Sequence, residues 1–123
     1  MIIDSNILIY YTDTTQTKLH AYLNDHFNEL FASDVTRLEV LGYSKIESDD
    51  KILLESFFKA IKVKSVSRNI IDKAIELRQQ KKMSMGDSII AATALIYNEP
   101  IFTHNEGDFK HIKGLVIIPL SSI

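Results

Sequence analysis

Cysteine is absent from the 123-residue chain, and proline occurs only twice. The absence of cysteine excludes disulfides, thiolate zinc sites and cysteine nucleophiles, and it agrees with a reducing compartment. No apolar run reaches the roughly 18 residues that a membrane helix needs, and no basic segment precedes a long apolar stretch at the amino terminus. We therefore expect a cytoplasmic protein with no membrane partner.

Apolar residues make up 46% of the chain, with five tyrosines and six phenylalanines. This composition is typical of an ordered globular protein, and no segment resembles a linker. A chain of this length fits one domain with a single hydrophobic centre. We expect that domain to span residues 1–123.

The net charge is only −2, but the charged residues are unevenly distributed. Residues 37–82 hold eleven of the fourteen lysines and arginines against seven acids. A basic flank of this kind can contact phosphate groups, and the candidates within it are Arg37, Lys45 and Arg68. The alternative is that most of these cations lie on solvated helix faces.

Short apolar runs predict strands at residues 1–4, 30–33, 62–66, 101–104 and 115–119. Apolar residues at helical spacing predict helices at 16–29, 34–46, 48–61, 67–82 and 85–98, and a turn or short helix after the first strand. This alternation is typical of an α/β domain with a parallel sheet covered by helices on both faces.

Two of the predicted helices have recognisable caps and apolar positions. Asp34 or Thr36 is a plausible cap for the helix at 34–46, and Ser67 is one for the helix at 67–82. The first of these helices has Val35, Leu38, Leu41 and Ile46 on one side. The second has a predicted buried stripe of Ile70, Ile71, Ala74, Ile75 and Leu77.

Four acids have contexts that distinguish them from ordinary surface acids, namely Asp4, Glu39, Asp87 and Asp108. Asp4 ends the first predicted strand and Asp108 follows the fourth, so both can reach the carboxyl edge of the sheet, where ligands bind in open α/β folds. Each acid also has a purely structural interpretation: a turn former at 4, an exposed helix residue at 39, a first-turn acid at 87 and a capping residue at 108.

If the four acids share one cavity, their mutual repulsion favours a bound cation. Mg²⁺ prefers oxygen ligands and keeps several waters, so the acids suit one ion, or two ions with a bound substrate. Such a metal would polarise a phosphodiester and supply hydroxide from its water. Asn6, Thr103 and Asn105 lie close to these acids in the sequence and are suited to orienting carboxylates or water. The histidines have no spacing typical of a zinc site.

With these residues identified, the chain resembles the PIN-domain ribonucleases, and within them the VapC toxins of type II toxin–antitoxin pairs. The resemblance spans nearly the whole chain and rests on "IIDSN", "VTRLEVLGY", "GDSIIAATAL" and "FTHNEGDFKHIKGLVIIP" in the family's order. It matches Asp4, Glu39, Asp87 and Asp108 to the family's acidic metal-binding set, Asn6 to its adjacent asparagine, and Thr103 and Asn105 to the polar residues before the last acid.

Two positions depart from the family's usual pattern. Ser5 stands where threonine is usual, which keeps the hydroxyl group. His104 stands where arginine is often found, and it is the fourth candidate for a contact with RNA phosphate. The resemblance implies a three-layer α/β/α sandwich, dependence on Mg²⁺ or Mn²⁺, cleavage of RNA, a homodimer and inhibition by a cognate antitoxin.

Two alternatives to a ribonuclease remain at this stage. A phosphoacceptor signalling domain has a similar length and also uses an acidic pocket with Mg²⁺, but it needs an acid at the end of a mid-chain strand and a lysine after a late strand. The other alternative is a non-catalytic binding module that retains the PIN-like fold.

Overall fold

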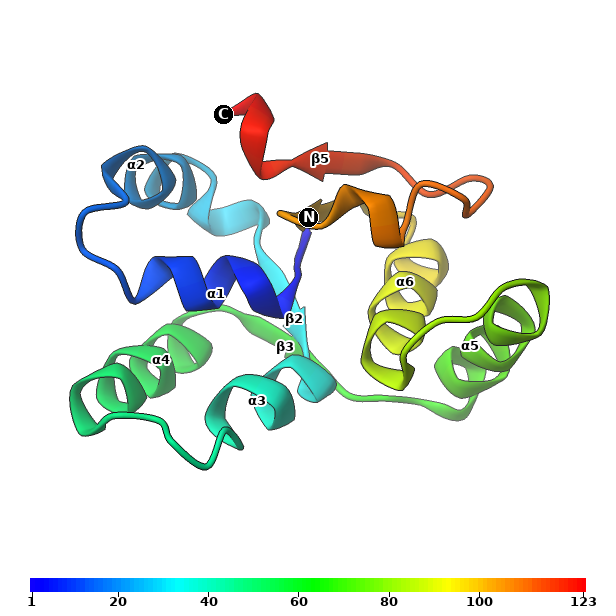
Figure 1. The fold of residues 1–123 in the computed structure, drawn as a ribbon, viewed down its shortest axis with the longest axis horizontal. Coiled ribbons are helices and arrows are strands. Elements are labelled where there is room, and N and C mark those ends of the chain that lie inside the picture. The colour runs from blue at the N-terminus through cyan, green and yellow to red at the C-terminus, as the bar shows by residue number, and fades with distance from the viewer.

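Five short strands form one sheet in the computed structural model, which describes residues 1–123. They are β1 (Ile2–Ile3), β2 (Phe31–Ser33), β3 (Lys62–Lys64), β4 (Ile101–Thr103) and β5 (Ile117–Pro119). Their order across the sheet is β3-β2-β1-β4-β5, and every pairing is parallel (Figure 1). All five strands predicted from the sequence are therefore confirmed, each within a residue or two of its expected limits.

Six α-helices connect and cover these strands. They are α1 (Ser5–Tyr11), α2 (Thr17–Asp25), α3 (Asp34–Leu41), α4 (Ser48–Ala60), α5 (Arg68–Gln80) and α6 (Met85–Tyr97). Three single 3-10 turns lie at Phe27–Glu29, Glu106–Asp108 and Leu120–Ser122. None of the helices combines the length and the apolar character that crossing a membrane requires.

Two separate hydrophobic cores flank the sheet, because successive strand residues point to opposite faces. Ile3, Ala32 and Phe102 pack with side chains of α1, α2 and α4 on one face. Their neighbours Ile2, Phe31 and Ile101 pack with α5 and α6 on the other. The predicted three-layer α/β/α architecture is confirmed, whereas the expected single hydrophobic centre is wrong, since a sheet buried on both faces needs a core on each side.

The cap and length predicted for α3 were wrong. The side chain of Ser33, not of Asp34 or Thr36, accepts the backbone N–H of Val35 at 3.1 Å. The helix ends at Leu41 instead of continuing to residue 46, and Gly42 is its C-terminal cap, with a backbone N–H that donates to the carbonyl of Leu38.

Several apolar side chains assigned to buried helix faces are exposed. On α3, Leu38 is 72% exposed, while Thr36 and Val40 are buried. On α5, Ile70, Ala74 and Leu77 are buried as predicted, but Ile71 and Ile75 are 39% and 50% exposed. The predicted stripe was too wide because α5 packs mainly against α6 and has one covered face. Ser67 caps α5 as predicted, accepting the N–H of Ile70 at 3.3 Å.

The direction of strand addition reverses between β1 and β4. From β1 the chain adds β2 and β3 on one side, and β4 and β5 on the other. In open α/β sheets such a reversal opens a crevice beyond the carboxyl ends of the two central strands. The residues that follow β1 and end β4, Asp4 and Thr103, therefore meet at this crevice.

Candidate active site at the carboxyl edge of the sheet

Asp4 is the buried centre of the crevice, with 4% of its surface exposed. Its backbone is extended, and it caps α1 by accepting the N–H of Ser5 on Oδ1 at 2.8 Å. The other oxygen, Oδ2, accepts the hydroxyl of Thr103 at 2.7 Å and the side-chain amide of Asn6 at 3.0 Å. Three donors from two elements thus fix the position of one carboxylate.

Asn6 links this carboxylate to the backbone that follows β4. Its amide nitrogen donates to Asp4, and its Oδ1 accepts the backbone N–H of His104 at 3.1 Å. The N–H of Asn105 in turn donates to the Thr103 hydroxyl at 3.0 Å. The neutral residues singled out from the sequence therefore form one hydrogen-bonded network around Asp4.

Glu39 reaches the same crevice from α3. Its Oε1 accepts the hydroxyl of Ser5 at 2.8 Å, which ties α3 to the start of α1. Its carboxylate also lies over the first turn of α6, where a Cβ built on Gly86 would be 2.5 Å from Oε2 and 2.9 Å from Cδ. The absence of a side chain at Gly86 gives the Glu39 carboxylate its space against the first turn of α6.

Asp87 lies in the first turn of α6, whose N-terminal cap is Ser84. The Ser84 hydroxyl accepts the backbone N–H of Asp87 at 3.1 Å, so this serine, and not Asp87 itself, caps the helix. Burial raises the pKa of the Asp87 carboxyl above its ordinary value, and the negative charges of Asp4 and Asp108 raise it further. If Asp87 interacted only with the helix dipole, its charged form would be stabilised there; instead, neighbouring acids disfavour that form.

Burial also raises the pKa of Asp4, because the charged carboxylate loses hydration. The hydrogen bonds from Thr103, Ser5 and Asn6 act in the opposite direction, and the charge of Glu39 adds to the increase. The charge of Glu39 thus acts on Asp4, and the charges of Asp4 and Asp108 act on Asp87, which connects the four acids at the carboxyl edge. Glu39 and Asp108 are the exposed members of the set, and Asp108 ends the 3-10 turn after β4.

The four basic or imidazole candidates from the sequence take different places. Lys45 lines a groove of about 680 Å³ bordered by α1, α3 and α4, to which Ser5 and Glu39 also contribute. His104 follows β4 directly, and its backbone N–H donates to Asn6. Arg37 instead pairs with Asp34 at 3.0 Å and faces a depression beside α4, and Arg68 is exposed at the start of α5.

The carboxylates do not form a closed cage in this structure. No three histidine, aspartate or glutamate side chains converge closely enough to hold one ion directly. The available donors are oxygen atoms of carboxylates, hydroxyls and amides, which is the donor set of hard cations such as Mg²⁺ and not of zinc. The residues present fit such an ion in chemistry, with waters completing its coordination.

Three residues of this region were not identified from the sequence. The cap at Ser84 was recognisable from "SMGD", a serine three residues before an acid at the start of an apolar helix. Gly86 and Tyr10 had no such signal, because their roles depend on side chains from other elements. Tyr10 packs its ring against that of His104.

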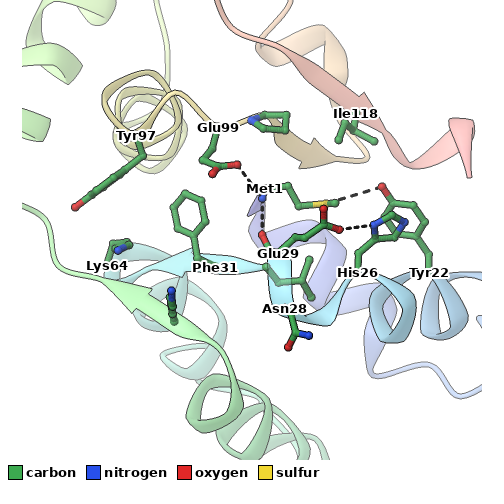
Figure 2. Close-up of a pocket in the computed structure, with 13 residues that line it drawn as sticks. Met1, Tyr22, His26, Asn28, Glu29, Phe31, Lys64, Tyr97, Glu99 and Ile118 are labelled. Carbon is green, nitrogen blue, oxygen red and sulfur yellow. Dashed lines mark hydrogen bonds and ion pairs between the residues drawn. The ribbon is translucent and has the colours of Figure 1, made fainter.

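A second hollow of about 630 Å³ lies at the opposite, amino edge of the sheet (Figure 2). Its acids already have partners: the Met1 amine donates to the carboxylate of Glu99 at 3.2 Å, and His26 contacts Glu29 at 2.7 Å. Lys64 lies over the Tyr97 ring, with its nitrogen 4.9 Å from the centroid. The amino edge therefore presents no cluster of mutually repelling acids.

Comparison with known proteins agrees with this geometry. The PIN domain model matches residues 1–115. A ribonuclease VapC from Rickettsia bellii (strain RML369-C) is 24% identical, with 96% of this chain and 94% of that protein covered. A toxin–antitoxin complex from Klebsiella pneumoniae is 26% identical, with a TM-score of 0.77 over 94% of each chain. VapBC2 from Rickettsia felis, bound to a promoter DNA fragment, is 20% identical, with a TM-score of 0.84 over 96% of each chain. The match to the family model over most of its length shows that the chain belongs to the PIN-domain family.

Proposed function

We propose that the chain is a Mg²⁺-dependent endoribonuclease and the toxin of a toxin–antitoxin pair. The observation that carries the proposal is the buried Asp4 carboxylate at the switch point of the sheet, held by three donors and facing the charges of Glu39 and Asp87. A fold that buries an acid among other acids without a basic partner is stabilised by a cation.

The hydrogen bonds of the site leave acceptor positions for such an ion. A carboxylate offers about four acceptor sites, and the donors on Asp4 occupy one on Oδ1 and two on Oδ2. One site on Oδ1 therefore remains. Glu39 uses Oε1 for Ser5 and keeps Oε2 for a ligand. Bound Mg²⁺, or Mn²⁺, supplies polarisation of a phosphodiester oxygen and an activated water.

The residues of the chain then have distinct roles in the proposed site. Asp4, Glu39, Asp87 and Asp108 hold the ion directly or through water. Asn6, Thr103 and Ser5 keep the first two of these carboxylates in fixed orientations through the hydrogen bonds described above. Asn105 supports the Thr103 hydroxyl through its backbone N–H. Lys45 is the cation best placed to contact an RNA phosphate near Glu39.

We also propose an antitoxin as protein partner, supported by the similarity to the VapBC2 and Klebsiella pneumoniae complexes. The groove beside Glu39 presents Ile9 and Tyr43, which are 64% and 58% exposed, and suits an apolar segment of such a partner. A homodimer is a further proposal, for which the exposed Leu38, Ile75 and Met85 offer apolar surface.

The topology argues against a phosphoacceptor signalling domain. Those domains use the strand order 2-1-3-4-5, whereas this sheet has the order β3-β2-β1-β4-β5. β2 and β3 end at Ser33 and Lys64, so neither mid-chain strand ends in an acid. A non-catalytic PIN-like binding module shares the fold and is separated from a nuclease by experiment.

The proposal is tested by incubating the purified chain with a mixed single-stranded RNA pool, with Mg²⁺, with Mn²⁺ or with excess chelator. We expect cleavage with either metal and none with the chelator. RNA binding without cleavage under all three conditions would instead identify a binding module. Addition of a partner encoded next to the chain is expected to suppress cleavage if the toxin role is correct.

A further inference from the structure

We propose that Tyr10 and His104 form a stacking platform for an RNA base next to the acidic cluster. The proposal rests on the proposed nuclease function and names how that site recognises its substrate. The two rings lie with their centroids 5.0 Å apart and their planes at 70°, an edge-to-face arrangement.

The platform follows from the helical spacing of α1. Asn6 and Tyr10 are one turn apart, so their side chains lie one above the other on the same face of the helix. Asn6 accepts the backbone N–H of His104 at 3.1 Å, and the ring of Tyr10 packs against the ring of the same residue. One face of α1 therefore holds both the backbone and the side chain of His104.

The rings are held before any substrate binds. Tyr10 is partly buried and packs against the core between the sheet and α1. The backbone on both sides of the imidazole is fixed, because the N–H of His104 donates to Asn6 and that of Asn105 donates to Thr103. A base that stacks here would meet a preorganised surface, which reduces the entropic cost of binding.

An edge-to-face pair leaves an imidazole face uncovered. If the imidazole packs its edge against the Tyr10 ring, that ring covers neither imidazole face. If Tyr10 packs its edge against the imidazole, it covers one imidazole face and leaves the other uncovered. His104 is an exposed residue, in agreement with a platform that solvent and substrate can reach. No side-chain hydrogen bond of His104 competes with stacking in this structure.

The position relative to the acids suits a nucleotide at the cleavage site. The side chain of Asn6 bridges the Asp4 carboxylate and the backbone of His104, so a single amide group separates the proposed ion ligand from the residue that carries the imidazole. In the proposal, a nucleotide whose phosphate faces the acids directs its base toward His104. Single-stranded RNA is commonly recognised by stacking of unpaired bases on aromatic side chains, including histidine.

Stacking also distinguishes this platform from a phosphate contact. A histidine that bound phosphate would act through charge or an N–H donor, and phenylalanine would not replace it. A histidine that stacks is replaced by phenylalanine with little loss, because both present a flat ring. Tyr97 provides a matched control: it is a partly exposed tyrosine that lines the hollow at the opposite edge of the sheet (Figure 2).

The experiment measures binding of a short single-stranded RNA, and of a ribose-phosphate chain of the same length without bases, to the Asp108→Asn protein in Mg²⁺. Adding His104→Ala or Tyr10→Leu is expected to weaken RNA binding roughly 5- to 100-fold and to leave binding of the baseless chain unchanged. His104→Phe and Tyr97→Leu are expected to bind RNA within about 3-fold of the parent protein.

Three results would overturn the platform: equal RNA affinity with and without His104→Ala, equal losses for the RNA and the baseless chain, or no RNA binding at all. The nuclease proposal is judged separately by RNA cleavage with the native chain. Absence of cleavage with the expected pattern of RNA binding would contradict the nuclease and leave the platform standing.

Discussion

The carboxylate of Glu39 lies over Gly86, although the two residues belong to different helices. A Cβ at Gly86 would come within 2.5 Å of Oε2, closer than such contacts allow, and within 3.1 Å of Oε1, which is a tight contact. The atoms in the way are the end of a flexible side chain and not backbone. Glu39 can therefore move aside, but only by leaving the place in which Ser5 holds it.

This relationship predicts that Gly86→Ala separates stability from activity. Alanine is favoured over glycine inside a helix by roughly 0.5–1 kcal/mol, so the variant is expected to be as stable as the native chain or slightly more stable. The displaced Glu39 carboxylate is expected to lower RNA cleavage at least about 10-fold. Thermal unfolding and initial cleavage rates give the two readouts.

Gly107→Ala is the matched control for that experiment, since nothing lies within 4 Å of a Cβ at this glycine. It should retain cleavage. If Gly86→Ala cleaved RNA at the native rate, the position of Glu39 would be irrelevant to the site.

Asp87→Asn is expected to change how stability depends on pH in the absence of metal. The folded-state pKa of Asp87 is raised, so its contribution to stability is fully present below the unfolded-state pKa of about 3.9 and is lost as pH rises through the folded-state value. Asparagine has no such dependence. Near neutral pH the variant is therefore expected to be more stable than the native chain with chelator present, and less stabilised by added Mg²⁺.

Urea unfolding at several pH values, with and without Mg²⁺, measures this difference. The exposed Asp72→Asn on α5 serves as the control and should follow the native curve. Parallel pH curves for the native chain and Asp87→Asn, with the same response to Mg²⁺, would return Asp87 to the role of a simple first-turn acid.

Thr103→Val tests whether the buried hydroxyl positions Asp4. The substitution keeps the volume but removes a donor to Asp4 and an acceptor for the N–H of Asn105, which is expected to cost about 1–3 kcal/mol of stability. Thr93→Val is the matched control, because Thr93 is also fully buried but its hydroxyl bonds only to the carbonyl of Ile89 within α6. Both variants should lose stability, and only Thr103→Val should lose cleavage; equal activity in the two would contradict the assignment.

Lys45 and Arg37 are expected to differ in their effect on RNA binding. Lys45 lines the groove next to Glu39, whereas Arg37 pairs with Asp34 on the side of α3 that faces α4. Lys45→Gln should weaken RNA binding and reduce the slope of log affinity against log salt concentration by about one, as expected for the loss of one phosphate contact. Arg37→Gln should change neither the affinity nor the slope. The reverse order of effects would place the RNA path along α4 instead.

The strands and the chemical character of the site followed from local sequence patterns. Asp4 ends a short apolar run that predicts a parallel strand. An acid at the carboxyl end of such a strand predicts a ligand-binding crevice from the sequence alone. The buried faces were harder to predict. Leu38 and Ile75 have helical spacing like their buried neighbours, and only the number of elements packed around each helix decides that they are exposed.

The long-range contacts of the site had no sequence signal. Gly86 leaves space for the carboxylate of Glu39, which lies 47 positions earlier in the chain. Tyr10 packs its ring against that of His104, which is likewise far away in the sequence. Arg37 was a candidate phosphate ligand as part of the basic flank, and it lies only two residues from Glu39 in the sequence. Residues two apart on a helix point to different sides, and the structure places Arg37 on the other side of α3.

The central claim is that the acids at the carboxyl edge form a metal-dependent ribonuclease site, and Asp108 tests it most directly. Asp108 is exposed, so Asp108→Asn should leave folding intact, and Glu106→Gln is a matched exposed acid in the same 3-10 turn. Cleavage of an RNA pool in Mg²⁺ is the measurement. We predict a loss of about 100-fold or more for Asp108→Asn and a rate within about 2-fold of native for Glu106→Gln. Equal cleavage by the native chain and both variants would contradict the claim.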